Sequence, residues 1–343
     1  MVPWSHPMAG DLHEHVIDSQ ALTGNPLGDP PRRPLWVWTP PGYEDEPGRR
    51  YPVIYRIQGF TGQLDMWRNR QPWKTNGVEA ADAVFVRGNV PPAILVYADA
   101  WTSLGGSQFV DSPAIGRYHT YLCEEVVPFV DARYRTLPAR EHRAVAGKSS
   151  GGYGAMITPM LRPDLFSALA THAGDALFEH CYLPDARSAA RTLRDRFEGS
   201  IDRFLAAFRA HPERMDDREW DILDIYAMSA SYAADADGTV HLPFDPIDGR
   251  LLPDVWERFL AWDPVRMVPA HADDLRSMRG IWIDAGRSDD YYLDLGAEAF
   301  RRELAAIGVT EPVVRFELFD GTHSGIDWRY PMALAWLAGR IAP

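Results

Sequence analysis

The sequence has few of the features that mark disulfide-rich, membrane or nucleic-acid-binding proteins. It holds only two cysteines, Cys123 and Cys181, in 343 residues, so neither a disulfide framework nor a cysteine-based metal cluster is expected. No apolar run approaches the length of a membrane span, and the segment after Met1 lacks the basic and apolar regions of a signal peptide. The formal net charge is −13 and basic residues are not clustered, which excludes the basic face that binds nucleic acid.

The remaining composition is that of a globular protein, 46% hydrophobic and 24% charged, long enough for one large domain or two ordinary ones. We expect a soluble, cytoplasmic protein that binds neither nucleic acid nor a membrane. His13 and His15 flank Glu14, but no partner cluster accompanies them, so no metal site is expected. The 12 Trp, 14 Tyr and 14 Phe should mostly fill the core, with a minority lining a pocket. The oligomeric state stays open, a homo-oligomer included.

The strongest functional signal is the glycine-rich hexapeptide Gly147–Gly152. A short apolar run, Arg143–Ala146, precedes it, and a helical pattern follows. A strand, the pattern Gly-x-Ser-x-Gly and a helix form the layout of a nucleophile elbow. In so tight a turn Gly147 and Gly151 leave room for neighbouring backbone, and the serine between them is held in a strained conformation. The pattern therefore predicts Ser149 as a catalytic nucleophile.

The neighbouring Ser150 fits this role less well, because its pattern would need glycine where Lys148 stands. We expect Ser150 to contribute its backbone amide, and Lys148 to be solvated or ion-paired. A second amide should come from the loop after an earlier strand, where Gly59 and Phe60 follow the apolar run Tyr51–Ile57. The amides of Phe60 and Ser150 are the predicted oxyanion donors.

Strand and helix patterns alternate along most of the chain, and several strands are apolar at almost every residue, as in strands buried on both faces. The expected strands are 14–18, 33–39, 51–57, 93–97, 143–146, 167–172, 280–286 and 313–318. The expected helices include 118–134, 186–197, 201–210, 219–232, 255–262, 292–307 and 327–341, and Pro128 should bend the end of the first. This alternation predicts an α/β fold with a mostly parallel central sheet and helices on both faces.

The alternation stops in one long segment, residues 177–274, which carries helical patterns alone. We interpret it as a helical cap inserted into a core formed by residues 1–176 and 275–343. Caps over an active site sequester the substrate and set specificity. The acidic residues of this segment are scattered, which favours a solvated outer face over substrate contacts.

A serine nucleophile needs a histidine base that a carboxylate holds in one tautomer. In doubly wound hydrolases both lie in loops after the late strands, with the acid before the histidine in the chain. His323 lies in the loop after the last expected strand, and Asp289 and Asp290 lie in the loop after the strand before it. We predict His323 as the base and Asp289 as the acid, with Asp290 as the alternative, while Asp284 lies within a strand and should be structural.

Four further residues are expected to line the substrate pocket. Gly59 and Trp101 follow expected strands, and His172 and Asp175 lie at the end of the strand next to the elbow. Their position makes His172 a rival base and Asp175 a rival acid. The chain order favours a role for both in the pocket wall.

Together these motifs resemble the putative-esterase (esterase D-like) family, which includes S-formylglutathione hydrolases, feruloyl esterases, enterochelin esterases and mycolyltransferases. The residues that carry the resemblance are 40–43, 51–55, 125–128, 147–155 and 319–324. The resemblance implies an α/β-hydrolase fold, an acid role for Asp289 and an oxyanion hole formed by the amides after Gly59 and Ser149. The chain departs from the family at Gln58, where relatives often have His or Asp, at Lys148, where many have His, and in its long cap.

The expected activity is the hydrolysis of carboxylic esters through an acyl-enzyme, with Ser149, His323 and Asp289 as the triad. No metal or organic cofactor is required, and a small-molecule ester is the expected partner. An acyltransferase of the mycolyltransferase type would use the same triad with an alcohol in place of water. A non-catalytic binding protein on a hydrolase fold is the third interpretation.

Overall fold

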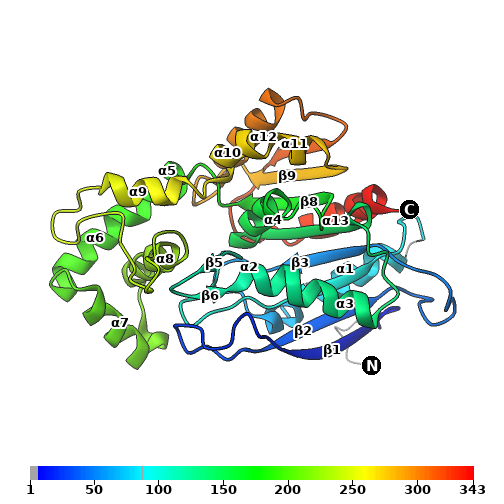
Figure 1. Cartoon of the computed structure of the whole chain (residues 1–343), viewed down its shortest axis with the longest axis horizontal. Helices are drawn as coiled ribbons and strands as arrows, with labels where there is room; N and C mark the ends of the chain where they lie inside the picture. The colour runs from blue at the N-terminus through cyan, green and yellow to red at the C-terminus, as the bar shows by residue number, and fades with distance from the viewer. Residues whose placement is uncertain (1–6, 87) are drawn as a thin grey trace.

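A computed structural model describes residues 7–86 and 88–343 of the chain; residues 1–6, where the sequence argues against a signal peptide, lie outside the described part. At its centre is an eight-stranded sheet in the order β1-β2-β4-β3-β7-β8-β9-β10 (Figure 1). The strands from β4 to β10 in this order are parallel to one another, whereas β2 runs antiparallel to both of its neighbours. The mostly parallel sheet expected from the sequence is confirmed.

The strands are β1 (Asp11–Asp18), β2 (Arg32–Thr39), β3 (Val53–Ile57), β4 (Ile94–Ala98), β7 (Arg143–Ser149), β8 (Ala168–Gly174), β9 (Gly280–Gly286) and β10 (Val314–Phe319). A separate small hairpin, which the sequence patterns did not predict, consists of β5 (Asp111–Ser112) and β6 (Gly116–Arg117). The longer helices are α1 (Gly77–Val86), α3 (Val127–Arg133), α4 (Ser150–Leu161), α6 (Leu183–Phe197), α7 (Ile201–Ala210), α8 (Asp217–Tyr232), α9 (Pro253–Leu260), α12 (Leu293–Ala306) and α13 (Arg329–Ile341). The shorter helical segments are η1 (Leu64–Arg68), α2 (Tyr118–Thr120), η2 (Tyr121–Val126), η3 (Arg140–His142), α5 (Phe178–Cys181), η4 (Pro212–Arg214), α10 (Pro264–Met267), η5 (Val268–His271) and α11 (Ala272–Arg276).

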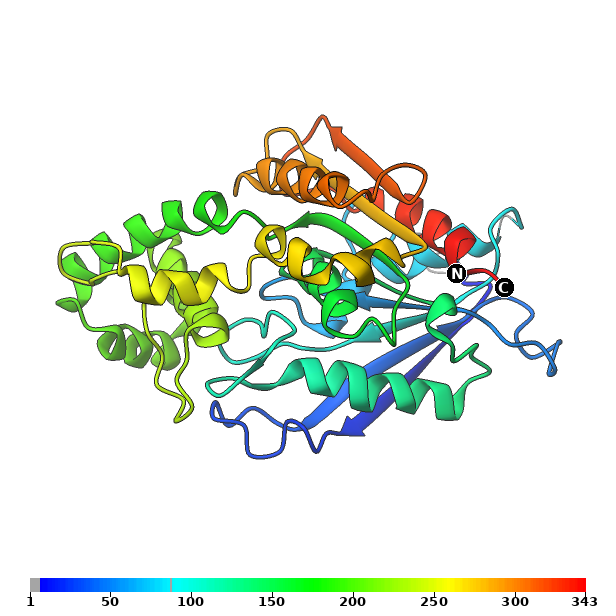
Figure 2. The same ribbon diagram turned by 45° about the horizontal axis from the view of Figure 1, so that its top comes forward.

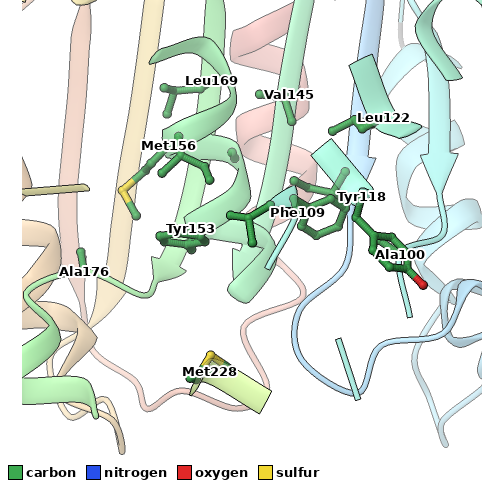
Figure 3. Packing of buried hydrophobic residues seen from close by; sticks show 14 of the residues in the cluster. Ala100, Phe109, Tyr118, Leu122, Val145, Tyr153, Met156, Leu169, Ala176 and Met228 are labelled. Carbon is green, nitrogen blue, oxygen red and sulfur yellow. The ribbon is translucent and has the colours of Figure 1, made fainter. Parts of the chain in front are cut away.

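The central strands are buried on both faces, as their continuous apolar runs predict. Every residue of β3, β4 and β8 is buried. Alternate side chains of β3 enter different clusters: Val53 and Tyr55 pack on the face that α4 and α12 cover, and Ile54 packs on the face of α1 and α13. Figure 3 shows part of the first cluster, where Val145 of β7 and Tyr153 of α4 lie among other buried apolar side chains. The sheet is therefore a middle layer between two helical layers.

The elements between β8 and β9 are all helices, and those from α5 to α9 lie beyond one end of the sheet (Figures 1 and 2). Helices α6 and α8 pack against each other, and α9 contacts α8. Further along, α10 and α11 return to the sheet and pack on α12 and α4. The division into a core and an inserted cap stays a prediction, although the expected helices of this segment are present. None of the helices in the described residues has the length and apolar character that a membrane crossing needs.

The helical stretch after β6 contains a widened segment that the sequence did not predict. Residues Tyr121–Val126 form π-helical turns immediately before α3, which carries Pro128 in its first turn. Proline lacks an amide hydrogen, and its ring clashes with the carbonyl one turn earlier in a regular α-helix. The wider π-helical turns before Pro128 are consistent with relief of that clash. The sequence predicts a bend of the helix end at Pro128, and the structure has widened turns immediately before it.

A buried ionic network joins the last three strands of the sheet to α13. His172 Nδ1 lies 2.6 Å from one carboxylate oxygen of Asp284, and the other oxygen accepts bonds from Trp282 Nε1 at 2.8 Å and Arg329 Nε at 2.7 Å. Arg329 also donates to Glu317 of β10 at 2.6 Å. Burial raises the pKa of the Asp284 carboxyl, but the charges of His172 and Arg329 outweigh burial and hold that pKa below its usual value. Asp284 therefore has the structural role that the sequence predicts.

Removing the Asp284 carboxylate should destabilise the fold. In Asp284→Ala the Arg329 guanidinium stays buried without its main partner, so we expect the free energy of unfolding in urea to fall by about 3 kcal/mol. The control is Glu198→Gln, which breaks the pair of Glu198 with Arg203, whose side chains are 76% and 58% exposed. An exposed pair contributes less than about 1 kcal/mol. Equal, small losses in the two variants would contradict a structural role of the network.

Candidate active site

The turn between β7 and α4 holds Ser149 in an unusual backbone conformation. Its φ is 58° and its ψ is −129°, which a residue with a side chain adopts only under strain. A methyl group added at Gly147 would lie 2.3 Å from the carbonyl oxygen of Gly151, and one added at Gly151 would lie 2.6 Å from the Ile57 carbonyl oxygen. Both glycines are therefore required by the close approach of backbone that the hexapeptide predicts.

The loop after β3 approaches the same turn from the neighbouring strand. A methyl group at Gly59 would lie 2.9 Å from the Lys148 carbonyl oxygen and 3.2 Å from Ser149 Cβ. Thr61, two residues further on, donates its amide to Gly105 at 2.7 Å and so fixes the loop. Within the described residues, the amide of Phe60 donates to no other group. The loop thus brings a free backbone donor close to Ser149, where an oxyanion donor is predicted.

Two loops at the carboxyl ends of β9 and β10 bring the predicted base and acid to Ser149. The Ser149 hydroxyl lies 3.2 Å from His323 Nε2, and His323 Nδ1 lies 2.9 Å from Asp289 Oδ2. His323 and Asp289 are buried, with 7% and 6% of their surface exposed, so the imidazole is held in a site with little water. This arrangement lets the carboxylate fix the ring with its proton on Nδ1 and the free Nε2 facing the serine.

The two neighbouring aspartates of the β9 loop have different partners. Asp289 Oδ1 accepts the amide of Tyr291 at 2.9 Å, which fixes the carboxylate whose other oxygen faces the His323 ring. Asp290 Oδ2 accepts the backbone amide of His323 at 3.3 Å. The Tyr291 ring stands edge-on to the imidazole, with the ring centres 4.9 Å apart. Asp289 therefore contacts the imidazole, and Asp290 contacts the backbone that carries it.

A cavity of about 380 Å³ opens at Ser149 and His323. Gly59 and Asp175, which the sequence predicts for the pocket, line it together with Phe60 and Ser150, the predicted oxyanion donors. Phe60 also contacts Trp220 of α8 edge-on, with ring centres 5.7 Å apart. The cavity is therefore bounded by the sheet edge on one side and by the helical segment on the other.

Asp175 connects these two sides. Its Oδ2 accepts bonds from the Ser150 hydroxyl at 3.1 Å and from the Tyr182 hydroxyl at 3.0 Å. Burial raises the pKa of the Asp175 carboxyl, and these hydrogen bonds oppose the rise. In the described part of the chain, the hydrogen-bond partners of the Asp175 carboxyl are Gln108, Ser150 and Tyr182, so Asp175 lies in the cavity wall and not in hydrogen-bond contact with the His323 ring.

Two residues predicted for the pocket do not line this cavity. His172 is buried to 1% exposure beneath it, paired with Asp284 and 4.8 Å from the Tyr330 ring. Trp101 is held in the loop after β4, where its carbonyl oxygen accepts a bond from Arg33 at 2.5 Å. His172 lies near the carboxyl end of β8 and Trp101 lies in the loop after β4, at the edge of the sheet where the site is, but position along the chain does not fix the direction of a side chain.

Several cavity residues went unpredicted because they lie in the helical segment or in loops. They are Tyr182, Asp185, Trp220, Asp224, Tyr291 and Asp327. The sequence favours a solvated outer face for the acidic residues of 177–274, but Asp185 and Asp224 are only partly exposed and face the cavity. Their helical spacing alone does not show which face of α6 and of α8 meets the other helix, so the sequence does not show that these two carboxyls lie at the cavity.

Lys148 lies in the same cavity, beside the nucleophile. Burial lowers the pKa of its ammonium, while the charges of Asp289 and Asp327 oppose that shift. In the described part of the chain, no three His, Cys, Asp or Glu side chains are arranged to hold a metal ion.

The chain is similar to known proteins over most of its length. Residues 31–335 match the family described as Putative esterase. The chain is 24% identical over 156 residues to an endo-1,4-beta-xylanase/feruloyl esterase of Xylanibacter ruminicola, which covers 45% of this chain and 20% of that protein. It is 30% identical over 135 residues to esterase Rv1288 of Mycobacterium tuberculosis, which covers 38% of this chain and 26% of that protein. The matches thus span only about a fifth to a quarter of the length of these relatives.

A solved structure of a ferulic acid esterase superposes on 97% of this chain and 99% of its own, with a TM-score of 0.61 and 20% identity. At this identity the likeness shows the fold alone. It confirms the α/β-hydrolase fold that the sequence motifs imply.

A methyl group at the elbow should disrupt it. We expect Gly151→Ala to lower the free energy of unfolding by about 2 kcal/mol or more, because the new methyl overlaps backbone that has nowhere to move. Gly339→Ala is the matched control: Gly339 is exposed in α13 with no atom near its added methyl. Alanine there should stabilise the helix by about 0.5–1 kcal/mol. Thermal and urea unfolding of both variants check this, and a Gly151→Ala protein as stable as the parent would contradict it.

Proposed function

The chain belongs to the Putative esterase family, and from this premise we propose that it is a serine hydrolase that cleaves carboxylic esters through an acyl-enzyme. The observation that carries the proposal is the continuous chain of contacts from Ser149 Oγ through the His323 ring to Asp289, at 3.2 Å and 2.9 Å. Relatives named as esterases support the reaction class. The family alone does not fix which residues act, so the roles below rest on the geometry.

In the proposed acylation step, Ser149 Oγ attacks the ester carbonyl carbon while His323 Nε2 takes the hydroxyl proton. The carbonyl π electrons move to oxygen, and the amides of Phe60 and Ser150 stabilise this oxyanion. When the tetrahedral intermediate collapses, His323 gives the proton to the departing alkoxide, and the alcohol leaves. Asp289 keeps the imidazole in one tautomer and stabilises its transient positive charge.

In the proposed deacylation step, a water molecule takes the place of the alcohol. His323 removes a proton from this water as it attacks the acyl carbon, and the proton then returns to Ser149 as the acid product leaves. Every proton taken in one step is given back in the next, so the cycle needs no cofactor. The strained backbone at Ser149 presents the hydroxyl above the sheet edge, where both loops reach it.

Removing the Ser149 hydroxyl should abolish ester hydrolysis. We expect Ser149→Ala to lower kcat/KM for p-nitrophenyl acetate by about four to six orders of magnitude, since the proposed acyl-enzyme forms on this hydroxyl. Ser103→Ala, which changes an exposed serine away from the cavity, is the control and should keep the parent rate. A Ser149→Ala protein that is folded and still hydrolyses the ester at the parent rate overturns the assignment.

The two neighbouring aspartates should differ in their effect on the rate. Asp289→Asn presents an amide to His323 Nδ1 and favours the wrong tautomer, so kcat should fall by about a thousandfold or more. Asp290→Asn keeps an oxygen that accepts the His323 backbone amide, and its kcat should fall by less than about tenfold. Initial rates with the same ester test the ranking, and the reverse order would move the acid role to Asp290.

A further inference from the structure

The helical wall of the cavity carries carboxyl groups that have no cationic partner. Asp185 lies in the first turn of α6 and Asp224 in the middle of α8, and both line the cavity that contains Ser149. Among the described residues, neither carboxyl forms an ion pair or accepts a hydrogen bond from a side chain. The Asp175 carboxyl lines the same cavity and its hydrogen-bond partners are neutral.

The charges around this wall are almost all negative. Burial is the main cause that raises the pKa of Asp224 well above its usual value, and the carboxyls of Asp185, Asp175 and Asp221 add to it. Burial and the charge of Asp221 raise the pKa of Asp185 to about 7. No arginine, lysine or histidine contributes to either shift. Lys148, which also lines the cavity, is close to Asp289 and Asp327 and does not act on Asp185 or Asp224.

Gathering ionised carboxyls in a poorly solvated wall costs free energy in the empty protein. Packing alone gives no reason for this cost, because an apolar side chain at either position would fill the same volume without it. A positively charged ligand would remove the cost, since an opposite charge within a few ångströms favours the ionised carboxyl. The arrangement is not that of a metal site, because no three carboxyl, histidine or cysteine groups of the described chain are positioned to hold an ion.

Aromatic rings surround the same part of the cavity. Tyr182 and Trp220 line it from the helical side, and Tyr291 lines it from the loop that carries Asp289. The faces of such rings attract organic cations, and an ammonium group next to both rings and carboxylates is held by two additive effects. The cavity is large enough for an ammonium-bearing group next to a reacting ester bond, at about 380 Å³.

We propose that this cavity selects esters that carry a positively charged ammonium group, which lies against Asp185, Asp224 and the surrounding rings while the ester carbonyl lies at Ser149. The inference rests on the proposed function, because it concerns the substrate class of the same site. It assigns Asp185 and Asp224 as specificity-determining residues.

The test compares esters that differ only in charge. One pair is acetylcholine, which carries its charge in the alcohol part, and its carbon isostere, in which a neutral tert-butyl group replaces the trimethylammonium group. The other pair is the p-nitrophenyl ester of γ-trimethylammoniobutyrate, which carries its charge in the acyl group, and the neutral isostere in which a tert-butyl group replaces the trimethylammonium group. For at least one pair we expect kcat/KM to be about tenfold higher for the cationic ester, the size that a desolvated cation–ring contact supports.

The carboxyls are tested with variants of equal shape. Asp224→Asn and Asp185→Asn should each remove most of the preference for the cationic ester, measured as the ratio of the kcat/KM values within a pair. Asp202→Asn, which removes an exposed carboxyl of α7 that does not line the cavity, is the matched control and should keep the full preference.

A pH series separates this effect from the titration of the triad. The quaternary ammonium groups do not titrate, and both members of a pair need the same neutral His323, so the ratio of their kcat/KM values cancels that requirement. Asp185 becomes a carboxylate as the pH rises through about 7, and the ratio should therefore rise across that range. In Asp185→Asn this rise should be lost.

The free energy of unfolding of Asp224→Asn distinguishes a ligand-binding role of this carboxyl from a structural one. A carboxyl whose pKa is raised in the folded state holds its proton more tightly there than in the unfolded chain, so it destabilises the fold above the unfolded pKa. Asp224→Asn should therefore be at least as stable as the parent at neutral pH and unchanged where the carboxyl is protonated in both states. A structural carboxylate would instead lose stability on substitution.

The outcomes separate this inference from the proposed function. Binding of the same ester pairs to Ser149→Ala, measured by calorimetry, does not depend on turnover and should show the same preference. Equal binding and equal rates within both pairs overturn the inference while Ser149-dependent hydrolysis stands. A preference that survives in both Asp185→Asn and Asp224→Asn overturns the assignment of these residues. Tighter binding and faster hydrolysis of the neutral isosteres would overturn the inference itself. Hydrolysis that persists in Ser149→Ala would instead reject the proposed function.

Discussion

The close contact of backbone with backbone at the end of β7 is the constraint on which the site depends. A methyl at Gly147 would overlap Gly151, and a methyl at Gly151 would overlap the end of β3, so the turn can form only between these strands and only with glycine at both positions. The contact leaves Ser149 at a positive φ, a conformation that costs free energy unless the surroundings enforce it. The buried strands on either side supply that enforcement, because none of them can shift without opening the core.

Much of this arrangement could be predicted from the sequence because its signals are local. Apolar runs in the sequence indicate the strands. The spacing of the glycines indicates the elbow, because it reflects a steric contact of backbone with backbone. The positions of His323 and Asp289 follow from a topological fact, since parallel strands bring their carboxyl ends to one edge of the sheet. The choice between Asp289 and Asp290 is different. The two are adjacent and chemically alike, and only the coordinates show that one faces the ring and the other the backbone.

The sequence could not predict features that depend on how one element is turned against another. Trp101 follows β4 and His172 lies near the carboxyl end of β8, at the edge of the sheet where the site is, yet neither residue lines the cavity. In the sequence, Asp185 and Asp224 are separated by α7 and have the pattern of surface residues. The packing of α6 on α8 is needed to place both at the cavity. Each of these depends on rotation about an element's axis, which residue type and spacing leave undetermined.

Asp175 connects the elbow to the helical wall, whereas Asp185 and Asp224 lie in the helical wall alone. Its carboxyl accepts a bond from Ser150, next to the proposed nucleophile, and another from Tyr182 at the start of the helical segment. A substitution at Asp175 would therefore disturb the elbow and the helical wall together. Asp185 and Asp224 are attached to helices alone and lack such bonds, so a change of their charge alters the field in the cavity without moving the elbow. If an ammonium group is recognised here, it is recognised by residues that the catalytic geometry does not need.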